Sequence, residues 1–399
     1  MARAFWTAAL TTVAVGTLLP SPVRAAQIDA DETRSSPVQH RFIHGRLGDA
    51  EFQMRLPVGW NGNLFVSSRG AGGDEFVMDQ TLMPTILGKG FAYAASDEGW
   101  FRPTLAARPQ DRLFESRARL VQLTGVARGI IEDHYGQPAS RVYLVGTSMG
   151  GHHVRWLLED FPELYDGAIS FAGLNSLWEF LRGQAALVRN YQLIQSRLNE
   201  IIAAATANPG WDPQVTPLSP PLTPEQIAAL RALYSMPASL ACGFEYDQGR
   251  LRGSESRWPA GYSTAIGALQ EMVPDVDPTY DPNGDGVRSL DELKMWDLAA
   301  RPVHVENQAR KLDLTGKVRR PLILVHGAAD PTVSPQESLA YKELVARNTG
   351  LADDVVRVYL VPNFGHGTYV PFLGPATDAL EAWVETGAAP GVIGGLLPR

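Results

Sequence analysis

Ser148 lies in a pattern that is typical of an enzymatic nucleophile. Gly146 and Gly150 flank it in a G-x-S-x-G pattern, directly after the apolar run 142–145 and before a helical pattern. A nucleophile on a sharp turn from a strand into a helix needs glycine on both sides, because a Cβ there would meet the neighbouring backbone. The first amides of the helix can stabilise negative charge on a tetrahedral intermediate. The pattern predicts a serine nucleophile; an ordinary Gly-rich turn is the alternative.

Two later loops supply the groups that a serine nucleophile requires. Asp330 follows the apolar run 322–325, and His366 lies in a Gly-flanked loop after the run 355–361. A serine hydroxyl is a poor nucleophile until a base takes its proton, so we assign the base to His366 and the orienting acid to Asp330. The alternatives are a structural loop histidine and a turn aspartate. The rival His326 lies inside a strand end, where we expect it to pack and hydrogen-bond.

The serine turn, the acid and the histidine, in this chain order, resemble the α/β-hydrolase superfamily. The resemblance covers about residues 40–172 and 320–386 and implies a serine hydrolase that forms an acyl-enzyme. Within the superfamily, tannases and feruloyl esterases have a comparable large lid with bound calcium. They also pair a cysteine beside the serine with one beside the histidine, where this chain has Thr147 and Gly367. We therefore expect the chain to lie outside the tannase and feruloyl esterase group.

The resemblance also implies an oxyanion hole made of two backbone amides. One amide is expected from Met149, the residue after the nucleophile. The other is expected from the loop 69–73, with Ala71 as the first choice and Gly70 as the second. Family members commonly carry His-Gly where this chain has Arg69-Gly70. We expect Arg69 to form a structural ion pair, and the alternative is that it reaches a substrate carboxylate.

Residues 281–292 form a second, independent motif. They match D-x-[DN]-x-[DN]-G-x5-E at every constrained position and resemble an EF-hand calcium loop, with Gly286 at the sharp turn. Calcium prefers several oxygen ligands in a flexible cage. The expected ligands are Asp281, Asn283, Asp285, the Val287 carbonyl, Ser289 through water, and bidentate Glu292. Residues 273–278 are poor helix material, so we expect a lone structural Ca²⁺ loop; a metal-free acidic turn is the alternative.

Apolar runs alternate with helical patterns over most of the chain. The expected strands are a hairpin of 41–44 and 52–56, followed by 63–66, 90–96, 142–145, 167–171, 322–325 and 355–361. The expected helices of this part are 114–134, 151–160 and 376–385. Strands buried on both faces read as continuous apolar runs and are connected by helices. The pattern therefore predicts an α/β-hydrolase fold, a mostly parallel sheet flanked by helices.

A long stretch, residues 173–319, interrupts this alternation. It has no convincing buried strand, and it has helical patterns at 187–205, 225–234 and 291–300. We interpret it as a mainly helical cap that carries the calcium loop. The cap separates an N-terminal core part, residues 26–172, from a C-terminal core part, residues 320–399. It would cover the catalytic face and help to select the substrate.

The first 25 residues predict an export signal. Arg3 precedes an uncharged apolar stretch, and Val23 and Ala25 place small side chains before a cleavage point. The stretch 4–19 is shorter than the roughly 20 residues that a membrane-spanning helix needs. We therefore expect a cleaved signal peptide rather than an anchor, a secreted or periplasmic protein, and no membrane span.

The composition excludes several classes of protein. With 45% hydrophobic residues the chain can form a sizeable core, which excludes disorder. There are 35 Lys and Arg against 43 Asp and Glu, a net charge of −8, and no basic block, so nucleic acid is not an expected partner. Cys242 is the only cysteine, which excludes an internal disulfide and a thiolate metal cluster. No organic cofactor is expected.

These features predict a secreted serine hydrolase that cleaves carboxylic esters, with a small-molecule or polymer-derived ester as its substrate. A serine peptidase of the prolyl-oligopeptidase type would share the order of the triad, but no β-propeller repeat precedes the hydrolase core. A hydrolase of carbon-carbon bonds in β-diketones would use the same triad. A non-catalytic, calcium-dependent binding module would show a broken triad, whereas all three residues are present here.

Overall fold

The computed structural model describes residues 26–70, 73–99, 112–208, 211–235, 246–247, 250–251, 258–286, 289–330, 332–367 and 369–399. In this part of the chain nine strands form one sheet in the order β1-β2-β3-β5-β4-β6-β7-β10-β11. The strands are β1 (Gln27–Arg34), β2 (His40–Leu47), β3 (Ala50–Pro57), β4 (Asn63–Ser68), β5 (Ala92–Ser96), β6 (Arg141–Thr147), β7 (Gly167–Phe171), β10 (Leu322–Gly327) and β11 (Val356–Val361). The pairs from β1 to β5 are antiparallel, and those from β5 to β11 are parallel.

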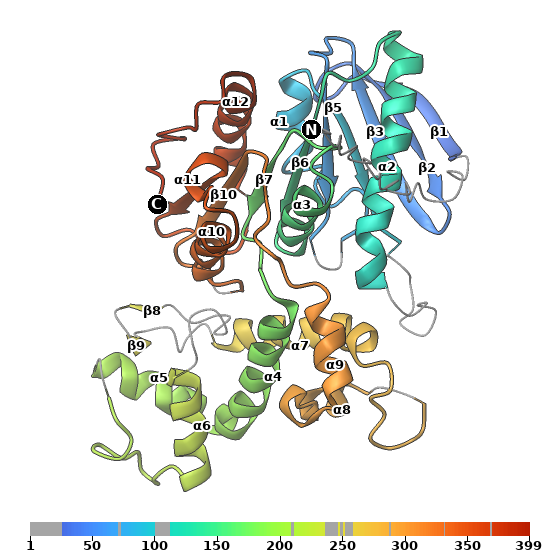
Figure 1. The fold of residues 1–399 in the computed structure, drawn as a ribbon. Coiled ribbons are helices and arrows are strands. Elements are labelled where there is room, and N and C mark those ends of the chain that lie inside the picture. The colour runs from blue at the N-terminus through green and yellow to red at the C-terminus, as the bar shows by residue number, and fades with distance from the viewer. Residues whose placement is uncertain are drawn as a thin grey trace, which may run out of the picture.

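Helices cover both faces of this sheet (Figure 1). The helices α2 (Arg112–Tyr135), α3 (Met149–Asp160) and α10 (Gln336–Thr349) pack with one hydrophobic cluster, and α1 (Met83–Gly88) and α12 (Val370–Thr386) pack with the other. The short α11 (Ala352–Val355) precedes β11. Along β4, Leu64 and Val66 belong to the first cluster and Phe65 to the second, as alternating strand side chains require. The sheet therefore has an apolar core on each face.

The segment between β7 and β10 forms a second lobe. It contains α4 (Leu177–Ile194), a 3₁₀ turn at Gln195–Arg197, α5 (Leu198–Ala207), α6 (Pro224–Ser235), β8 (Tyr246–Asp247), β9 (Arg250–Leu251), α7 (Trp258–Val276), α8 (Leu290–Met295), a 3₁₀ turn at Leu298–Ala300 and α9 (Val303–Arg310). Figure 1 shows this lobe below the sheet, with α7 on the side that faces the core. A hydrogen bond of 3.3 Å from Leu113 N to Asp275 Oδ2 connects the start of α2 to the end of α7.

Three helical regions of this lobe differ from the sequence-based expectation. The pattern at 187–205 is divided between α4 and α5 by the 3₁₀ turn. The expected helix 291–300 ends at Met295, because Trp296 is extended and fully buried and donates from Nε1 to Asp277 Oδ2 at 2.9 Å. Conversely, α7 continues to Val276 through Pro274. Met272, Val273 and Val276 are buried, so tertiary packing outweighs the cost of the proline.

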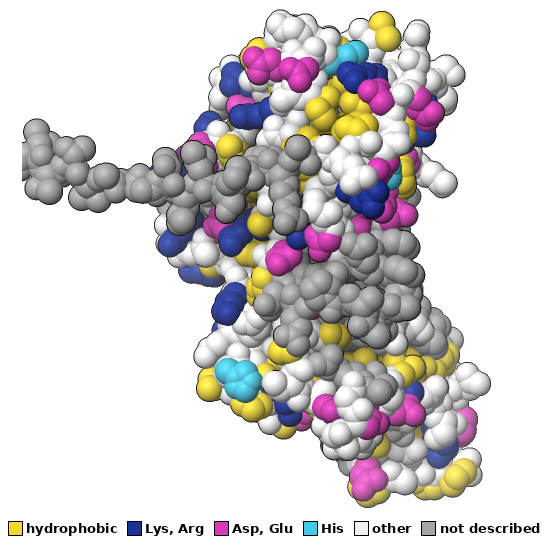
Figure 2. All heavy atoms as spheres, turned by 90° about the vertical axis from the view of Figure 1, so that its right-hand side faces the viewer, with side chains coloured by type: hydrophobic (Ala, Val, Ile, Leu, Met, Phe, Trp, Pro, Cys, Tyr) yellow, Lys and Arg dark blue, Asp and Glu magenta, His cyan; other side chains and the backbone are white. Residues whose placement is uncertain are grey.

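The surface carries mixed charges. On the face drawn in Figure 2, basic and acidic side chains are interspersed, without a continuous basic stretch. Within the described residues, no helix combines the length and the hydropathy that a membrane crossing requires. The expected signal peptide, residues 1–25, lies outside the described residues.

Candidate active site

Ser148 occupies the sharp turn between β6 and α3. Its φ of 62° and ψ of −121° are unusual for a residue with a side chain. Its amide donates to Phe171 O at 2.8 Å, which fixes the turn against β7. A Cβ on Gly146 would lie 2.4 Å from Gly150 O, and a Cβ on Gly150 would lie 2.4 Å from Arg69 O. Both positions therefore require glycine, and the backbone around Ser148 has the strained geometry of a nucleophile elbow.

Asp330 and His366 contact each other from the loops that follow β10 and β11. Nδ1 of His366 lies 2.8 Å from Oδ2 of Asp330. Oδ1 of Asp330 accepts from the amides of Thr332, at 2.8 Å, and Val333, at 3.0 Å. Burial alone would raise the pKa of Asp330, but hydrogen bonds from His326 and His366 outweigh it and hold the pKa below its usual value. The charged carboxylate can therefore orient His366 and stabilise its protonated form.

His326 belongs to the support of Asp330. It is fully buried, and its Nε2 donates to Val333 O at 2.9 Å and lies 3.4 Å from Asp330 Oδ2. Its Nδ1 lies 2.8 Å from Ser338 Oγ. Burial lowers the pKa of His326, which favours the neutral imidazole. His326 thus packs and hydrogen-bonds, as the sequence predicts.

Parallel pairing brings the three predicted catalytic residues to one edge of the sheet. Phe171 of β7 pairs with Thr147 of β6 on one side and with Val325 of β10 on the other. The C-terminal ends of these strands therefore meet at the same edge. Ser148 and His366 do not form a hydrogen bond with each other in this structure. Such bonds are often long before a substrate binds.

A pocket of about 210 Å³ lies beside Ser148, between the core and the cap. Its described lining residues are Ser148, Met149, Leu174, Phe180, Thr264, Gly267, Ala268, Glu271, Met272 and Thr332. Thr332 belongs to the loop of Asp330, so the pocket contacts both the serine turn and the acid loop. Helix α7 contributes half of the described lining, which places the cap directly over the candidate nucleophile.

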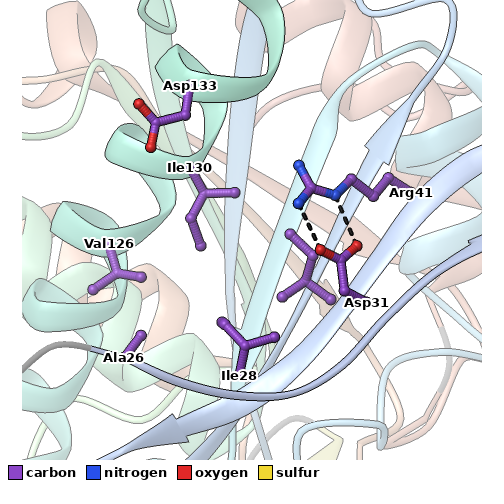
Figure 3. A pocket seen from close by; sticks show the side chains of 8 residues that line it. Ala26, Ile28, Asp31, Arg41, Val126, Ile130 and Asp133 are labelled. Carbon is purple, nitrogen blue, oxygen red and sulfur yellow. Dashed lines mark hydrogen bonds and ion pairs between the residues drawn. The ribbon is translucent and has the colours of Figure 1, made fainter.

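A second hollow lies elsewhere, between β1, β2 and α2 (Figure 3). Its volume is about 340 Å³, and Ile28, Val126 and Ile130 make much of its wall apolar. Asp31 and Arg41 form an ion pair of 2.6 Å at this hollow. None of the predicted catalytic residues lines it, so it is not part of the candidate active site.

Two of the expected oxyanion-hole residues can be located. Met149 is the first residue of α3 and is buried at the pocket beside Ser148. Gly70, the second choice for the other amide, lies against the end of β6, since a Cβ on it would be 3.5 Å from Thr147 O. Ala71, the first choice, lies outside the described residues and stays a prediction.

A buried polar cluster behind this loop was not recognised in the sequence. Glu98 Oε1 accepts from Ser68 Oγ at 2.7 Å and from Arg69 N at 3.4 Å. His153 Nδ1 lies 3.0 Å from Glu98 Oε2 and 3.1 Å from Ser68 Oγ. Burial opposes ionisation of Glu98, but the charge and hydrogen bond of His153, followed by Arg69 and Ser68, lower its pKa. The cluster fixes the end of β4, from which the candidate oxyanion loop starts.

The described part of the expected calcium loop has features that fit a cation. Carboxylate oxygens of Asp281, Asp285 and Glu292 lie within 4.8 Å of one another. Asp281 accepts from Gly284 N, at 2.8 Å, and Gly286 N, at 2.9 Å, which folds the loop. Glu292 is buried, and its Oε1 has no hydrogen-bond partner among the described residues. An orphaned buried carboxylate oxygen is what a metal ligand would leave in the absence of its ion.

Three further ligands are expected: Asn283, Val287 and Ser289. Asn283 and Ser289 are exposed in this loop, and Val287 lies outside the described residues. Ser289 also caps α8: its Oγ accepts from Glu292 N at 3.2 Å, while Glu292 Oε2 accepts from Ser289 N at 2.6 Å. Residues 273–278 were expected to be poor helix material, and this expectation is wrong for 273–276, because α7 runs to Val276 before the loop. Helix α8 follows the loop.

Comparison with solved structures defines the fold class. Feruloyl esterase B from Aspergillus oryzae matches with a TM-score of 0.59 and 17% identity, over 89% of this chain and 82% of that one. Tannin acyl hydrolase from Aspergillus niger matches with a TM-score of 0.55 and 16% identity, over 92% of this chain and 83% of that one. The predicted α/β-hydrolase fold is confirmed.

The chain belongs to the tannase and feruloyl esterase family, whose model matches residues 40–209 and 221–395. It is a carboxylic ester hydrolase. A curated relative, mono(2-hydroxyethyl) terephthalate hydrolase of Piscinibacter sakaiensis, is 23% identical over 502 residues, covering 96% of this chain and 82% of that protein. The peptidase, β-diketone hydrolase and binding-module alternatives are therefore set aside.

The expectation that the chain lies outside this family is wrong. It rested on the missing cysteines beside the serine and the histidine. Here non-covalent contacts tie the same regions together. Phe171 stacks on Tyr369 at 5.0 Å, and the Tyr369 hydroxyl accepts from Gly327 N at 3.1 Å and donates to Gly365 O at 3.3 Å. These contacts connect the strand beside the serine turn with the acid and histidine loops without a disulfide.

Proposed function

We propose that the chain is a secreted serine esterase that hydrolyses esters of aromatic carboxylic acids through an acyl-enzyme on Ser148. The contact of 2.8 Å between Asp330 and His366, at the same edge of the sheet as the strained turn of Ser148, carries this proposal. An acid-histidine pair at the sheet edge that carries a serine elbow is the arrangement that activates a hydroxyl nucleophile.

The reaction would proceed in two half-reactions. Nε2 of His366 takes the proton of Ser148 Oγ as this oxygen attacks the ester carbonyl carbon. The amide of Met149 and an amide of the loop 69–73 would hold the oxyanion. The intermediate collapses when His366 returns the proton to the leaving alkoxide, which departs as an alcohol. Water then attacks the carbonyl carbon of the acyl-enzyme while His366 takes its proton, and His366 returns this proton to Ser148 Oγ as the carboxylic acid leaves.

The preference for aromatic acyl groups is supported by the pocket and by the relatives. Leu174, Phe180 and Met272 give the described pocket an apolar wall beside the nucleophile. Such a wall suits an aromatic ring, which buries a large apolar area. The names of the relatives, a terephthalate ester hydrolase and a feruloyl esterase, also refer to esters of aromatic acids.

Hydrolysis of p-nitrophenyl esters tests the reaction. The purified chain from Ala26 onward should release p-nitrophenol from a series of acetate, butyrate, benzoate and palmitate esters. Ser148→Ala should reduce kcat by roughly 10³-fold or more, with almost no change in Tm, because only the nucleophilic oxygen is removed. Retained turnover in the folded Ser148→Ala variant would refute the assignment.

We also propose that residues 281–292 bind a structural Ca²⁺. The support is the motif, the convergence of three carboxylates within 4.8 Å and the orphaned Oε1 of Glu292. Asp281, Asp285 and Glu292 would supply charged oxygens, and Asn283, Val287 and Ser289 the neutral ligands. The ion would stabilise the cap in a chain that has no disulfide.

Secretion is proposed from the sequence of residues 1–25. The short apolar stretch and the small residues before Ala26 are the layout of a cleaved signal peptide. When the full chain is produced in a bacterium with an export pathway, the protein in the periplasm or medium should begin at Ala26. Accumulation of uncleaved chain in the cytoplasm would contradict export.

A further inference from the structure

Two imidazoles face the same oxygen of the candidate acid. Nδ1 of His366 lies 2.8 Å from Oδ2 of Asp330, and Nε2 of His326 lies 3.4 Å from the same oxygen. In the proposed reaction only His366 takes up a proton beside this carboxylate. A proton on His326 as well would place a second positive charge there and weaken His366 as a base, because a like charge lowers the pKa of an imidazole. The proposed reaction therefore requires a neutral His326.

The hydrogen bonds of His326 show which of its ring nitrogens carry a proton. Nε2 lies 2.9 Å from Val333 O, and a carbonyl oxygen can only accept, so Nε2 carries a hydrogen. Nδ1 lies 2.8 Å from Ser338 Oγ, a hydroxyl, which can either donate or accept. The direction of this second hydrogen bond therefore decides between a neutral imidazole and an imidazolium.

Arg155, on α3, fixes that direction from the other side of Ser338, on α10. Its Nη2 donates to Ser338 Oγ at 3.1 Å, and a guanidinium has no acceptor. The hydroxyl oxygen thus already accepts from Arg155, and its own hydrogen is available for Nδ1 of His326. A hydrogen on Nδ1 would compete with Arg155 for the same oxygen and would turn the hydroxyl hydrogen away from both groups. The arrangement therefore favours an Nδ1 without a proton.

Arg155 is itself held firmly. It is fully buried, and it donates from Nε to Ser170 Oγ at 2.9 Å and from Nη1 to Asn175 Oδ1 at 2.8 Å. Burial lowers the pKa of Arg155 to about 10, so the guanidinium stays charged at neutral pH. Burial is also the main cause that lowers the pKa of His326, and the positive charge of Arg155 lowers it further. Charge and hydrogen-bond direction thus act on His326 in the same sense.

The other titratable groups around these side chains act in defined directions. The hydrogen bond and the negative charge of Asp330 oppose burial and raise the pKa of His326. Tyr369 also faces Asp330, and burial raises its pKa, so its hydroxyl stays neutral. Three groups pack around Arg155 and favour its charged form: Tyr341, Glu337 and Glu159. Removing Arg155 would therefore shift His326 towards the protonated form that Asp330 favours.

We infer that Arg155 and Ser338 keep His326 neutral at the pH at which the enzyme works. Arg155 is thus a positioning residue, which acts on the candidate acid through two other side chains. His366 then remains the one imidazole that takes up a proton beside Asp330. This inference rests on the proposed function, because it assigns the base to His366.

NMR of the histidine rings tests the state of His326 directly. The chain from Ala26 onward is produced with isotope-labelled histidine, and the signals of His326 are identified by their loss in His326→Gln. In the parent, His326 should carry a proton on Nε2 alone from about pH 8 to about pH 5.5, one unit below the usual pKa of histidine. In Arg155→Met, and to a smaller extent in Ser338→Ala, both nitrogens should become protonated within this range.

The pH dependence of p-nitrophenyl acetate hydrolysis tests the consequence. In Arg155→Met a charged His326 weakens His366 as a base, so kcat should fall more steeply towards acid pH than in the parent. The ratio of the parent kcat to the variant kcat should rise by about tenfold from about pH 8 to about pH 5.5. A purely structural defect would lower kcat by the same factor at every pH. Arg347→Met removes an arginine that is 65% exposed on α10, and its ratio should stay constant.

The outcomes separate this inference from the proposed function. If Arg155→Met does not fold, as judged by the loss of its thermal transition, Ser338→Ala and the NMR signals of the parent decide the question. An imidazolium at His326 in the active parent would overturn the inference and leave the esterase intact. Unchanged His326 signals with a constant kcat ratio in the folded variants would do the same. Activity that survives Ser148→Ala would instead refute the proposed function itself.

Discussion

The ring of Tyr369 stacks on Phe171 with 5.0 Å between the ring centroids. Phe171 O accepts from the amide of Ser148, and the Tyr369 hydroxyl contacts Gly327 and Gly365, so this pair connects the candidate nucleophile with both later loops. Burial, followed by the charge of Asp330, raises the pKa of Tyr369, which keeps its hydroxyl protonated as a donor.

Tyr369→Phe should therefore loosen the histidine loop while keeping the stack. We expect the free energy of unfolding to fall by about 1 kcal/mol and kcat to fall several-fold, because one buried hydroxyl with two partners is removed. Urea denaturation and ester kinetics measure the two effects. Tyr359→Phe removes a hydroxyl that bonds near the C-terminus, to Pro390 O and Gly391 O, and should leave kcat unchanged. Equal kcat values in Tyr369→Phe and the parent would contradict this role.

Glu98 is expected to position the candidate oxyanion loop. In Glu98→Gln the charge opposite His153 is lost, and the hydrogen bonds to Ser68 and Arg69 weaken. We expect kcat to fall by on the order of tenfold with little change in KM, since the loop acts on the transition state. Glu132→Gln, an exposed change on α2, is the matched control. A lower Tm with unchanged kcat would show that Glu98 has only a structural role.

Calcium should stabilise the cap. The Tm of the parent chain should rise when EDTA is replaced by millimolar Ca²⁺; a ligand at 1,000 times its Kd adds about 4 kcal/mol to the free energy of unfolding. In Asp281→Ala with Glu292→Ala this response should disappear. The variants are compared by the change in Tm between EDTA and Ca²⁺ and not by the Tm itself. Glu292 also caps α8, so its removal lowers the Tm even without metal. Asp291→Ala changes a neighbouring acid that is 89% exposed and should keep the response. An identical Tm in EDTA and Ca²⁺ for the parent would remove the calcium site.

Asp97 should make the protein less stable as the pH rises from about 4 to about 6. Burial raises its pKa to about 6, whereas an aspartate in the unfolded chain titrates near 3.9. In this window the unfolded chain releases the proton that the folded chain retains, so the contribution of Asp97 to the free energy of unfolding decreases. Asp97→Asn should remove this decrease. Urea denaturation at several pH values measures it, with the exposed Asp354→Asn as control; parallel pH profiles of Asp97→Asn and the parent would contradict the shift.

The turn and loops of the candidate active site were predictable because their signals are local. The apolar run before Ser148, the two glycines around it and the glycine-flanked His366 each report the backbone geometry of a few adjacent residues. Parallel pairing then brings the ends of β6, β7 and β10 to one edge, as the rules for such sheets require.

The supporting contacts were not predictable, because each joins distant segments. Ser68 ends β4, Glu98 lies in the turn after β5 and His153 lies in α3, and no short motif connects them. The same holds for Glu271, which reaches the pocket only because the cap folds over the core. Helix propensity also gave the wrong expectation for the residues around Pro274, because burial of its neighbours keeps α7 helical as far as Val276. The error on family membership arose because a missing cysteine pair says nothing about the aromatic contact of Tyr369 that connects the same loops.

Ser148 is tested as the nucleophile by identifying the residue that reacts with an organophosphate. The chain from Ala26 onward would be inactivated with diethyl p-nitrophenyl phosphate, digested and analysed by mass spectrometry. We predict one diethylphosphoryl group per chain, on Ser148, which accumulates in parallel with the loss of ester hydrolysis. Complete inactivation with Ser148 unmodified and the label on another residue would contradict it.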